Sequence, residues 1–268
     1  MTFAEYAAID AINASAIVAG RVSMRHMHAE MMHERKTDSP AMAWGRKVHA
    51  AVLEPDRFFA SLAIWDGAVK RGKEWDAFKA ANPDPDAIVT RSELSDLESM
   101  KRAIWDHAIA SDMLRGVETE QVIQWEDDVY GAGKARMDAV KPGMVIDYKT
   151  TRNIEPAAFY RTAYNLAYHV RMGWYAHGIE IATGTRPRVY LVVQESDRPF
   201  DCWACEIPAS ILKAGEKEAF EIAVRYSIAR NDGGRYWGVS NEMEEYQLPA
   251  WAMGGEDATP NMEGVNNE

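Results

Sequence analysis

Cysteine is scarce in this chain, and its scarcity limits the chemistry that the protein can perform. The two cysteines among the 268 residues, Cys202 and Cys205, have the C-x-x-C spacing of zinc and redox sites. No second C-x-x-C and no His pair completes the four ligands of a structural zinc ion. Residues 200–207 alternate as in a strand, so we expect both thiols to be buried and structural.

Long apolar stretches and nucleotide-binding motifs are also missing. No uninterrupted apolar run approaches the ~18–20 residues that a membrane-spanning helix needs. The N-terminal residues lack the basic start of a secretory signal, so we expect a cytoplasmic protein without membrane contact. The absence of a G-x-x-x-x-G-K-[ST] phosphate loop and of a G-x-S-x-G elbow argues against NTPases, helicases and α/β-hydrolases.

Positive charge is in the minority, since 41 Asp and Glu face 30 Lys and Arg and the net charge is −11. A protein with broad affinity for nucleic acid usually has a basic surface. Only a locally basic groove would therefore admit DNA. Part of the acidic excess lies near the C-terminus, and the low apolar content of residues 253–268 predicts a disordered acidic tail.

The remaining composition is that of a folded globular protein, with 47% hydrophobic and 26% charged residues. The length suffices for a sizeable core. We expect one domain over residues 1–252, with a helical part at 1–117 and a sheet core at 118–252.

The most informative stretch is residues 131–151, which predicts two strands at 134–140 and 144–151 around a Lys-Pro-Gly turn. In an antiparallel pair centred on that turn, Asp138 faces Asp147, and opposed Cβ atoms are about 4.5–5.5 Å apart. Lys149 projects from the same face as Asp147 because side chains alternate along a strand. Two facing carboxylates destabilise a hairpin unless they share a cation, so a divalent metal is the expected reason for them.

Helices are expected on both sides of this hairpin. We predict a helical region at 2–35 with Ser15 as an N-cap, and a helix at 92–110 with Ser92 or Ser95 as its cap. The other predicted helices are 41–53, 74–80, 156–183 and 209–229, and the other predicted strands are 118–129, 188–195 and 200–207. The order predicts an α/β (α+β) fold, a central mixed sheet of about five strands flanked by helices with a helical N-terminal region.

Several motifs follow one another in a recognisable order. The motifs are a G-x-x-x-H helix at Gly45 and His49, a carboxylate near Glu120, then Asp138, then Asp147-Tyr148-Lys149, and a later helix ending in Tyr175. In the order of these motifs the chain resembles the PD-(D/E)xK nuclease superfamily. Within it the chain is similar to phage RecE-type (exonuclease VIII-like) exonucleases and, more distantly, to lambda exonuclease. The similarity extends over roughly residues 10–250.

The resemblance implies a metal-dependent exonuclease that degrades double-stranded DNA from its ends, with Asp138, Asp147 and Lys149 as catalytic residues. The metal ligands that it implies are His49, Glu120, Asp138, Asp147 and the backbone carbonyl of Tyr148. One or two Mg²⁺ ions would be held, and a His ligand makes substitution by Mn²⁺ plausible. The resemblance also implies 5′→3′ polarity, a ring-shaped homo-oligomer, a single-strand annealing protein as partner, and a bacterial or phage-infected host cell.

Two of these assignments have alternatives. Glu118 is the fallback for Glu120 as the metal-site carboxylate. Taken alone, His49 is more simply a partly buried core histidine, and only the motifs downstream favour a ligand. Gly45 costs its helix about 1 kcal/mol relative to Ala, which predicts close packing against the hairpin.

Residues expected to contact DNA are Arg171, Tyr175, His169, Arg136 and Arg25. Arg171 stands where the similar enzymes have a Gln, and Arg has no acceptor, so it would grip a phosphate instead. The His cluster at positions 26, 28 and 33 is expected at the surface rather than at a metal. The row Tyr160, Tyr164 and Tyr168 has the four-residue spacing of core residues more often than of a stacking platform.

Two rival functions remain open. The first is an endonuclease of the same fold, which would cut closed circular DNA, whereas an exonuclease needs a free end. The second is a catalytically silent module that binds DNA or protein; intact Asp138, Asp147 and Lys149 argue against it, and Arg171 leaves it open.

Overall fold

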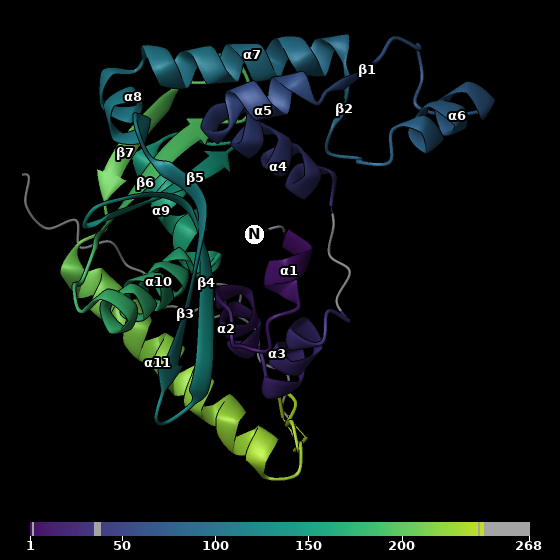
Figure 1. Ribbon diagram of the computed structural model, residues 1–268. Coiled ribbons are helices and arrows are strands. Elements are labelled where there is room, and N and C mark those ends of the chain that lie inside the picture. Colours follow the sequence, from purple (N-terminus) through teal and green to yellow (C-terminus); the bar gives the residue numbers. More distant parts are fainter. Residues whose placement is uncertain (2, 35–38, 241, 244–268) are drawn as a thin grey trace, which may run out of the picture.

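A mixed sheet of five strands forms the centre of the molecule, in the spatial order β3-β4-β5-β6-β7 (Figure 1). The computed structural model describes residues 1, 3–34, 39–240 and 242–243. The strands are β3 (Glu118–Asp127), β4 (Gly131–Lys141), β5 (Met144–Thr151), β6 (Arg188–Glu195) and β7 (Cys202–Glu206). Strands β5 and β6 run parallel, and the other neighbours run antiparallel. The predicted mixed sheet flanked by helices is confirmed.

The hairpin of β4 and β5 turns at residues 141–143, as the sequence predicts. Gly143 has φ +73°, a left-handed conformation that glycine adopts without strain. The paired residues are Ala139 with Ile146, Val140 with Val145, and Lys141 with Met144. This is the predicted register, but the ladder ends one pair short of Asp138 and Asp147. The two strands therefore separate where the carboxylates begin.

Helices cover both faces of the sheet and enclose two apolar cores (Figure 1). On one face α2 (Ala14–Gly20), α10 (Tyr168–Thr183) and α11 (Ala209–Asn231) surround a core that includes Trp174 and Val193. On the other face α4 (Pro40–Leu53), α7 (Arg91–Asp106) and α8 (Ala108–Leu114) surround a core that includes Met100 and Val192. Neighbouring residues of β6 thus point into different cores, as the alternation of a strand requires.

The N-terminal region is helical, as predicted, but it is divided into short pieces. Helices α1 (Phe3–Ala7), α2 and α3 (Met24–Met31) are separated by turns. The prediction of Ser15 as N-cap is wrong, because the Asn13 side chain accepts from the amide of Ala16 at 3.0 Å and begins α2 two residues earlier. Ser23 caps α3. Of the histidines at positions 26, 28 and 33, His28 contacts the Tyr226 hydroxyl at 3.1 Å and stacks on Tyr236.

In the segment between α4 and β3, the long helix α7 (Arg91–Asp106) begins and ends at other residues than predicted. Thr90 and Glu93 form a reciprocal capping box that begins α7, so neither Ser92 nor Ser95 is the cap. The predicted helix at 92–110 is broken at His107, whose extended backbone separates α7 from α8. A parallel pair, β1 (Ala63–Trp65) and β2 (Ile88–Thr90), was not predicted. These strands are three residues each, too short for a periodic signal.

Two further helices belong to this segment. Helix α5 (Pro55–Ala60) follows α4 directly, and α6 (Lys73–Ala81) matches the predicted helix at 74–80. Figure 1 shows α6 at the end of the β1–β2 extension, away from the main sheet. Its aromatic residues Trp75 and Phe78 pack on Trp65 rather than on either core. This extension is therefore a small aromatic lobe attached to the body.

The helix predicted at 156–183 is two helices, α9 (Pro156–Asn165) and α10. Ala167 has φ +55°, a left-handed conformation that is unusual for a non-glycine residue and stops the helix. The break removes Tyr160 and Tyr164 from the core, so the core interpretation of the tyrosine row is wrong for them: they are 53% and 64% exposed. Tyr168, which begins α10, packs against the core as predicted.

Two other predictions concern the C-terminal part. The helix predicted at 209–229 is α11 (Ala209–Asn231). The predicted disordered tail at 253–268 lies outside the described residues. Among the described residues, no helix combines the length and the apolar character that crossing a bilayer requires.

Helices α10 and α11 approach each other closely because each has a glycine at the crossing. A Cβ on Gly215 would lie 1.9 Å from the backbone oxygen of His169, and one on Gly173 would lie 2.3 Å from the amide nitrogen of Glu216. By contrast, a Cβ on Gly45 in α4 would lie 4.0 Å from Thr150 Oγ1. The prediction that Gly45 permits a tight contact with the hairpin is therefore wrong.

We expect Gly215→Ala to lower the free energy of unfolding by about 1–3 kcal/mol or more, because backbone atoms must move apart. Gly45→Ala is the matched control in another helix, and we expect it to raise stability by up to about 1 kcal/mol. Urea unfolding followed by circular dichroism measures both. Equal stability of Gly215→Ala and the wild type would contradict the close crossing.

The two cysteines are free and project from opposite faces of β7. Cys202 is buried, with its thiol 3.7 Å from the carbonyl oxygen of Ala103, whereas Cys205 is half-buried against the other core. They cannot act as a pair, so the structural interpretation holds, although only Cys202 is fully buried. Burial raises the pKa of Cys202 to about 11.

We expect iodoacetamide to alkylate Cys202 at pH 8 roughly 100-fold more slowly in the native protein than in the unfolded chain, because the thiolate is the reactive form. Mass spectrometry of the modified peptide measures the rates. Equal rates in both states would show that the thiol is accessible and ionised, against the burial described here.

Candidate active site

Three carboxylates stand at neighbouring positions on three adjacent strands. Between β3 and β4, Thr119 pairs with Ala139, and Gln121 pairs with Met137. The residues between them, Glu120 and Asp138, face each other but do not pair. Since Asp138 also lies at the point where β4 leaves β5, the ladder is interrupted on both sides of it. The interruptions bring Glu120, Asp138 and Asp147 into one row.

Glu120 has a backbone conformation that indicates a special position. Its φ is +54°, inside a strand whose other residues are extended. A left-handed non-glycine residue costs on the order of 1–3 kcal/mol and persists where surrounding contacts hold it. Here the contacts are those of its carboxylate with His49 and Arg136. Glu118 has an exposed side chain, so of the two alternatives it is Glu120 that joins the row.

His49 reaches the row from α4, on the other side of the hairpin. Its Nε2 lies 3.1 Å from Asp138 Oδ2, and its Nδ1 lies 3.5 Å from Glu120 Oε1. Burial alone would lower the pKa of His49, but the charges of Asp138 and Glu120 raise it above the ordinary value. His49 is thus a bridge between two carboxylates and not an isolated core histidine.

Lys149 occupies the space between the other two carboxylates. Its Nζ forms an ion pair with Asp147, lies 3.7 Å from Asp138 Oδ2, and donates to the backbone oxygen of Tyr148 at 3.2 Å. The Tyr168 ring lies 5.5 Å from the same ammonium group. Burial by itself lowers the pKa of Lys149, yet Asp147 and Asp138 raise it above its usual value. Lys149 is therefore protonated in this arrangement.

The pKa values of the two aspartates are shifted in opposite directions. Burial acts to raise the pKa of Asp138, but His49 and Lys149 hold it well below its usual range, and the amide of Tyr148 donates to its Oδ2 at 3.0 Å. Burial, followed by the charge of Asp138, raises the pKa of Asp147 to about 6. Asp147 therefore gives up its proton at a higher pH than Asp138 does. Such separated values are typical of functional sites.

The donor set suits a hard divalent cation, since it combines carboxylates, an imidazole and the Tyr148 carbonyl. Asp147 Oδ2 supports this fit, because it is buried and has an ion pair but no hydrogen bond of good geometry. Within the described part of the chain, however, no group of three or more His, Cys, Asp and Glu is arranged as a ready metal site. His49 and Lys149 hold the oxygens instead. Binding of a cation therefore requires Lys149 to release Asp147.

Arg171 and Tyr175 reach the site from α10, one turn apart. Arg171 is half-buried; its Nη1 donates to Ser15 Oγ at 3.4 Å, and it is hydrogen-bonded to Tyr175. Both side chains are close enough to Asp147 for the charges to interact. The residue at the position where the similar enzymes have a Gln is thus a half-buried cation whose charge interacts with that of Asp147.

The other residues expected to contact DNA are placed less uniformly. Arg136 forms an ion pair with Glu120 at 2.5 Å and so belongs to the row. His169 lies 3.4 Å from Glu218 and stacks on Tyr164 at 5.3 Å, beside the site but not in it. Arg25 is not brought to the site: it donates to the backbone oxygens of Tyr236 and Trp237 at 3.1 and 3.2 Å. The placement of Arg25 at a DNA surface is not supported by these contacts.

Sequence reasoning missed two residues that border the site, Tyr6 and Lys134. Lys134, Arg136 and Asp138 alternate along β4 and share a face, so the strand periodicity offered a signal for Lys134. No comparable signal existed for Tyr6, which reaches the site through the packing of α1 against β4.

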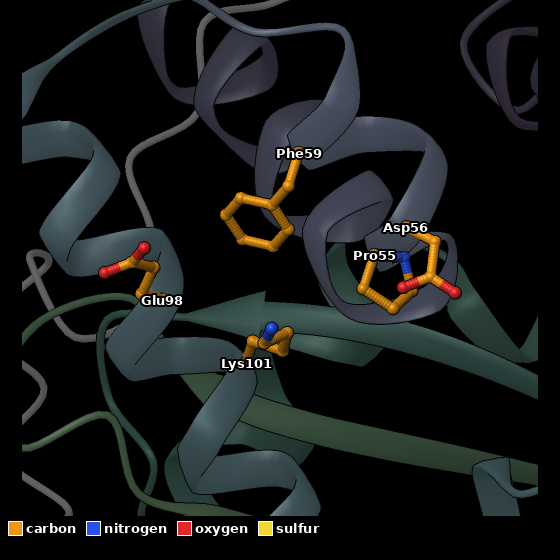
Figure 2. A pocket seen from close by; sticks show the side chains of 5 residues that line it. All are labelled: Pro55, Asp56, Phe59, Glu98 and Lys101. Atoms are coloured by element: carbon orange, nitrogen blue, oxygen red, sulfur yellow. The ribbon is translucent and has the colours of Figure 1, made fainter.

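A surface hollow of about 420 Å³ lies between α5 and α7 (Figure 2). Its lining residues are Pro55, Asp56, Phe59, Glu98 and Lys101. The Lys101 ammonium stands 4.7 Å from the centre of the Phe59 ring. None of these residues belongs to the carboxylate row, and their mixed charges converge on no common point. The hollow is therefore not the candidate site.

The His49–Asp138 pair predicts a pH-dependent stability in the metal-free protein. Because the pKa of His49 is higher in the folded protein than in the unfolded chain, the protonated imidazole stabilises the fold. This stabilisation is fully present below the unfolded-state pKa of about 6.5, and it is lost as the pH rises through the folded-state pKa. Because the pKa of Asp138 is lower in the folded protein than in the unfolded chain, its ionised carboxylate stabilises the fold. This stabilisation is present above the unfolded-state pKa of about 3.9, and it is lost as the pH falls through the folded-state pKa. The contribution of the pair is therefore greatest between about pH 4 and 6.5.

We expect His49→Gln to destabilise the protein most in that window and less above pH 8. Urea midpoints measured in EDTA across the pH range test this, with His33→Gln as a surface control. A deficit that grows with rising pH would contradict the ion pair.

Comparison with known proteins places this geometry in a family. Residues 14–233 match the family described as a PDDEXK-like domain of unknown function, DUF3799. No curated protein matches the chain.

The fold is similar to that of a candidate exonuclease from Eubacterium rectale, with 12% identity, a TM-score of 0.63, and coverage of 95% of this chain and 96% of that one. A phage-related exonuclease from Haemophilus somnus aligns over 83% of this chain and 96% of its own at 13% identity, but its TM-score of 0.36 supports no argument. The matched residues include the whole carboxylate row, and the chain belongs to the PDDEXK-like DUF3799 family and has the fold of the PD-(D/E)xK nuclease superfamily.

Proposed function

We propose that the protein is a metal-dependent nuclease that hydrolyses phosphodiester bonds of DNA, acting as an exonuclease on duplex ends. The observation that carries the proposal is the row of Glu120, Asp138 and Asp147 on adjacent strands, with Lys149 between the two aspartates. Membership of a PDDEXK-like family supports the same chemistry. The fold shared with the candidate exonuclease of Eubacterium rectale agrees with it.

The metal would be Mg²⁺, with Mn²⁺ as a substitute. It would be held by His49, Glu120, Asp138, Asp147 and the carbonyl of Tyr148. When bound, one or two such ions supply Lewis-acid stabilisation of the attacking and leaving oxygens. The carboxylates contribute the negative charge that selects a divalent cation, and the buried position of Asp147 strengthens that attraction.

Lys149 has a proton-holding role that depends on its partners. In the present arrangement Asp147 and Asp138 keep it protonated. Once these carboxylates are engaged elsewhere, Lys149 loses the support for its charge while most of its side chain stays shielded from water, so its pKa falls. It is then able to orient the attacking water and accept its proton.

Arg171 is the residue that would grip the DNA backbone. Its guanidinium is fixed by Ser15 and Tyr175 and remains charged at any physiological pH. A guanidinium has donors in a fork that matches phosphate oxygens. In similar enzymes a Gln stands here, so this chain would replace a neutral donor and acceptor by a permanent cation.

Finer features of the function rest on the resemblance alone. They are a preference for double-stranded DNA, 5′→3′ polarity, a ring-shaped homo-oligomer, partnership with a single-strand annealing protein, and a cytoplasmic location in a bacterial or phage-infected cell. The net charge of −11 is consistent with DNA entering only at a locally basic groove.

Linear and covalently closed duplex DNA distinguish this function from its rivals. With Mg²⁺ we expect degradation of the linear form only, and none in EDTA. Asp147→Ala is expected to reduce the rate at least about 100-fold, because it removes charge stabilisation of the transition state. Glu120→Gln is expected to reduce it as well. Glu118→Gln, two residues away and exposed, is the matched control.

Each other outcome supports a different function. Cutting of closed circles would indicate an endonuclease with the same chemistry. Binding of DNA without hydrolysis, in Mg²⁺ and in Mn²⁺, would indicate a silent interaction module. Full activity of Asp147→Ala would refute the assigned site.

A further inference from the structure

The N-terminal segment, residues 3–15, lies against the candidate site, and most of it precedes the family match that begins at residue 14. Figure 1 shows α1 beside β4, below α4. A hydrogen-bonded bridge ties this segment to β4, because the amide of Ile12 donates to Ala132 O at 2.9 Å and the amide of Lys134 donates to Ile12 O at 2.8 Å. The segment is therefore held to β4 by backbone hydrogen bonds.

Lys134 holds the segment in place. Its side chain is 2% exposed, and its ammonium group donates to the backbone oxygens of Tyr6 (2.8 Å), Ala7 (3.3 Å) and Ile9 (2.7 Å). The same ammonium lies 4.7 Å from the centre of the Tyr6 ring. A buried ammonium group is costly unless its donors are satisfied. Three carbonyls for three N–H donors make Lys134 specific for this segment.

The held segment touches both arginines that flank the carboxylates. The Arg136 guanidinium lies 5.6 Å from the centre of the Phe3 ring while it pairs with Glu120 at 2.5 Å. At the other end of the segment, Ser15 Oγ accepts from Arg171 Nη1 at 3.4 Å. Each of the two cations thus has one partner in the segment, Phe3 or Ser15, besides its partner Glu120 or Tyr175.

Tyr6 lies between these two contacts. Burial, with the neighbouring Tyr175, raises the pKa of its hydroxyl, and the nearby charges of Arg171 and Arg136 partly offset the rise. Its surroundings therefore include residues from β4 and from α10. One short helix joins the two elements that supply the cations of the site.

We propose that residues 3–15 are a positioning segment of the candidate site, and that Lys134 is its anchor. Phe3 keeps Arg136 on Glu120, and Ser15 keeps Arg171 beside Tyr175. The effect of the segment on DNA cleavage rests on the proposed function, whereas its effect on the positions of Glu120 and Arg171 does not. A displacement of about 1 Å at a catalytic site is able to cost on the order of 100-fold in rate.

Lys134→Met tests the anchor, because it keeps the length of the side chain and removes its donors. Hydrogen exchange read by mass spectrometry is expected to accelerate at residues 3–9 and at 118–122. The kcat for linear DNA is expected to fall 10- to 100-fold with a smaller change in KM. Lys141→Met is the control on the same strand, since Lys141 also donates to a carbonyl, that of Asp112 at 3.0 Å, but away from the site. We expect it to match the wild type in both measurements.

Phe3→Ala provides a second test that does not threaten the core, because Phe3 is 66% exposed. It is expected to lower kcat and to accelerate exchange at residues 118–122, and Phe3→Tyr is expected to restore both. Ile109→Ala, at a side chain with 61% exposure in α8, is the control for loss of a surface apolar group.

The outcomes separate this proposal from the proposed function. If the wild type cleaves no DNA, the function fails, and exchange at residues 118–122 in the two variants still decides whether the segment positions the site. Unchanged exchange at residues 3–9 in Lys134→Met would refute the anchor. Faster exchange at 3–9 with unchanged exchange at 118–122 and unchanged kcat would refute positioning. If Lys134→Met does not fold, Phe3→Ala decides alone.

Discussion

The structure depends on the gathering of three carboxylates, one of them fully buried and two partly buried, at one point of the sheet. Asp147 is 1% exposed, and Asp138 and Glu120 stand at the neighbouring positions of the next two strands. Carboxylates removed from water are costly unless cations and donors compensate for them. Lys149, His49, Arg136 and the amide of Tyr148 supply this compensation. The interrupted ladders and the left-handed Glu120 are the backbone consequences of bringing these groups together.

The cationic groups of the site come from near and from far in the sequence. Lys149 lies on the same strand as Asp147, whereas His49 is supplied by α4 and Arg171 by α10. Each of these elements is fixed by one of the two cores, so the positions of the charges depend on packing on both faces of the sheet. The Gly173–Gly215 crossing sets how closely α10 lies on α11, and it thereby affects where Arg171 stands.

The cationic side chains of the site are paired with its carboxylates. Lys149, Arg136 and His49 are paired with carboxylates, so a cation that binds these carboxylates must release at least one of them. These ion pairs join the three side chains and the carboxylates of three strands in one electrostatic network.

The sequence by itself determined the features that follow from local spacing. The Pro-Gly turn, the alternation of Asp147 and Lys149, and the facing of Asp138 and Asp147 are consequences of strand periodicity over a few residues. The five strands and most of the helices follow from the same patterns.

Only the tertiary structure decided the rest, since long-range packing is able to override local preference. It separated α9 from α10 at Ala167, placed the cap of α2 at Asn13, and exposed Tyr160 and Tyr164. It also distinguished Glu120 from Glu118, because the choice depends on a contact with His49 about seventy residues earlier in the chain. Tyr6 borders the site for the same physical reason: it is brought there by the docking of α1 on β4, and no spacing along the chain encodes that contact.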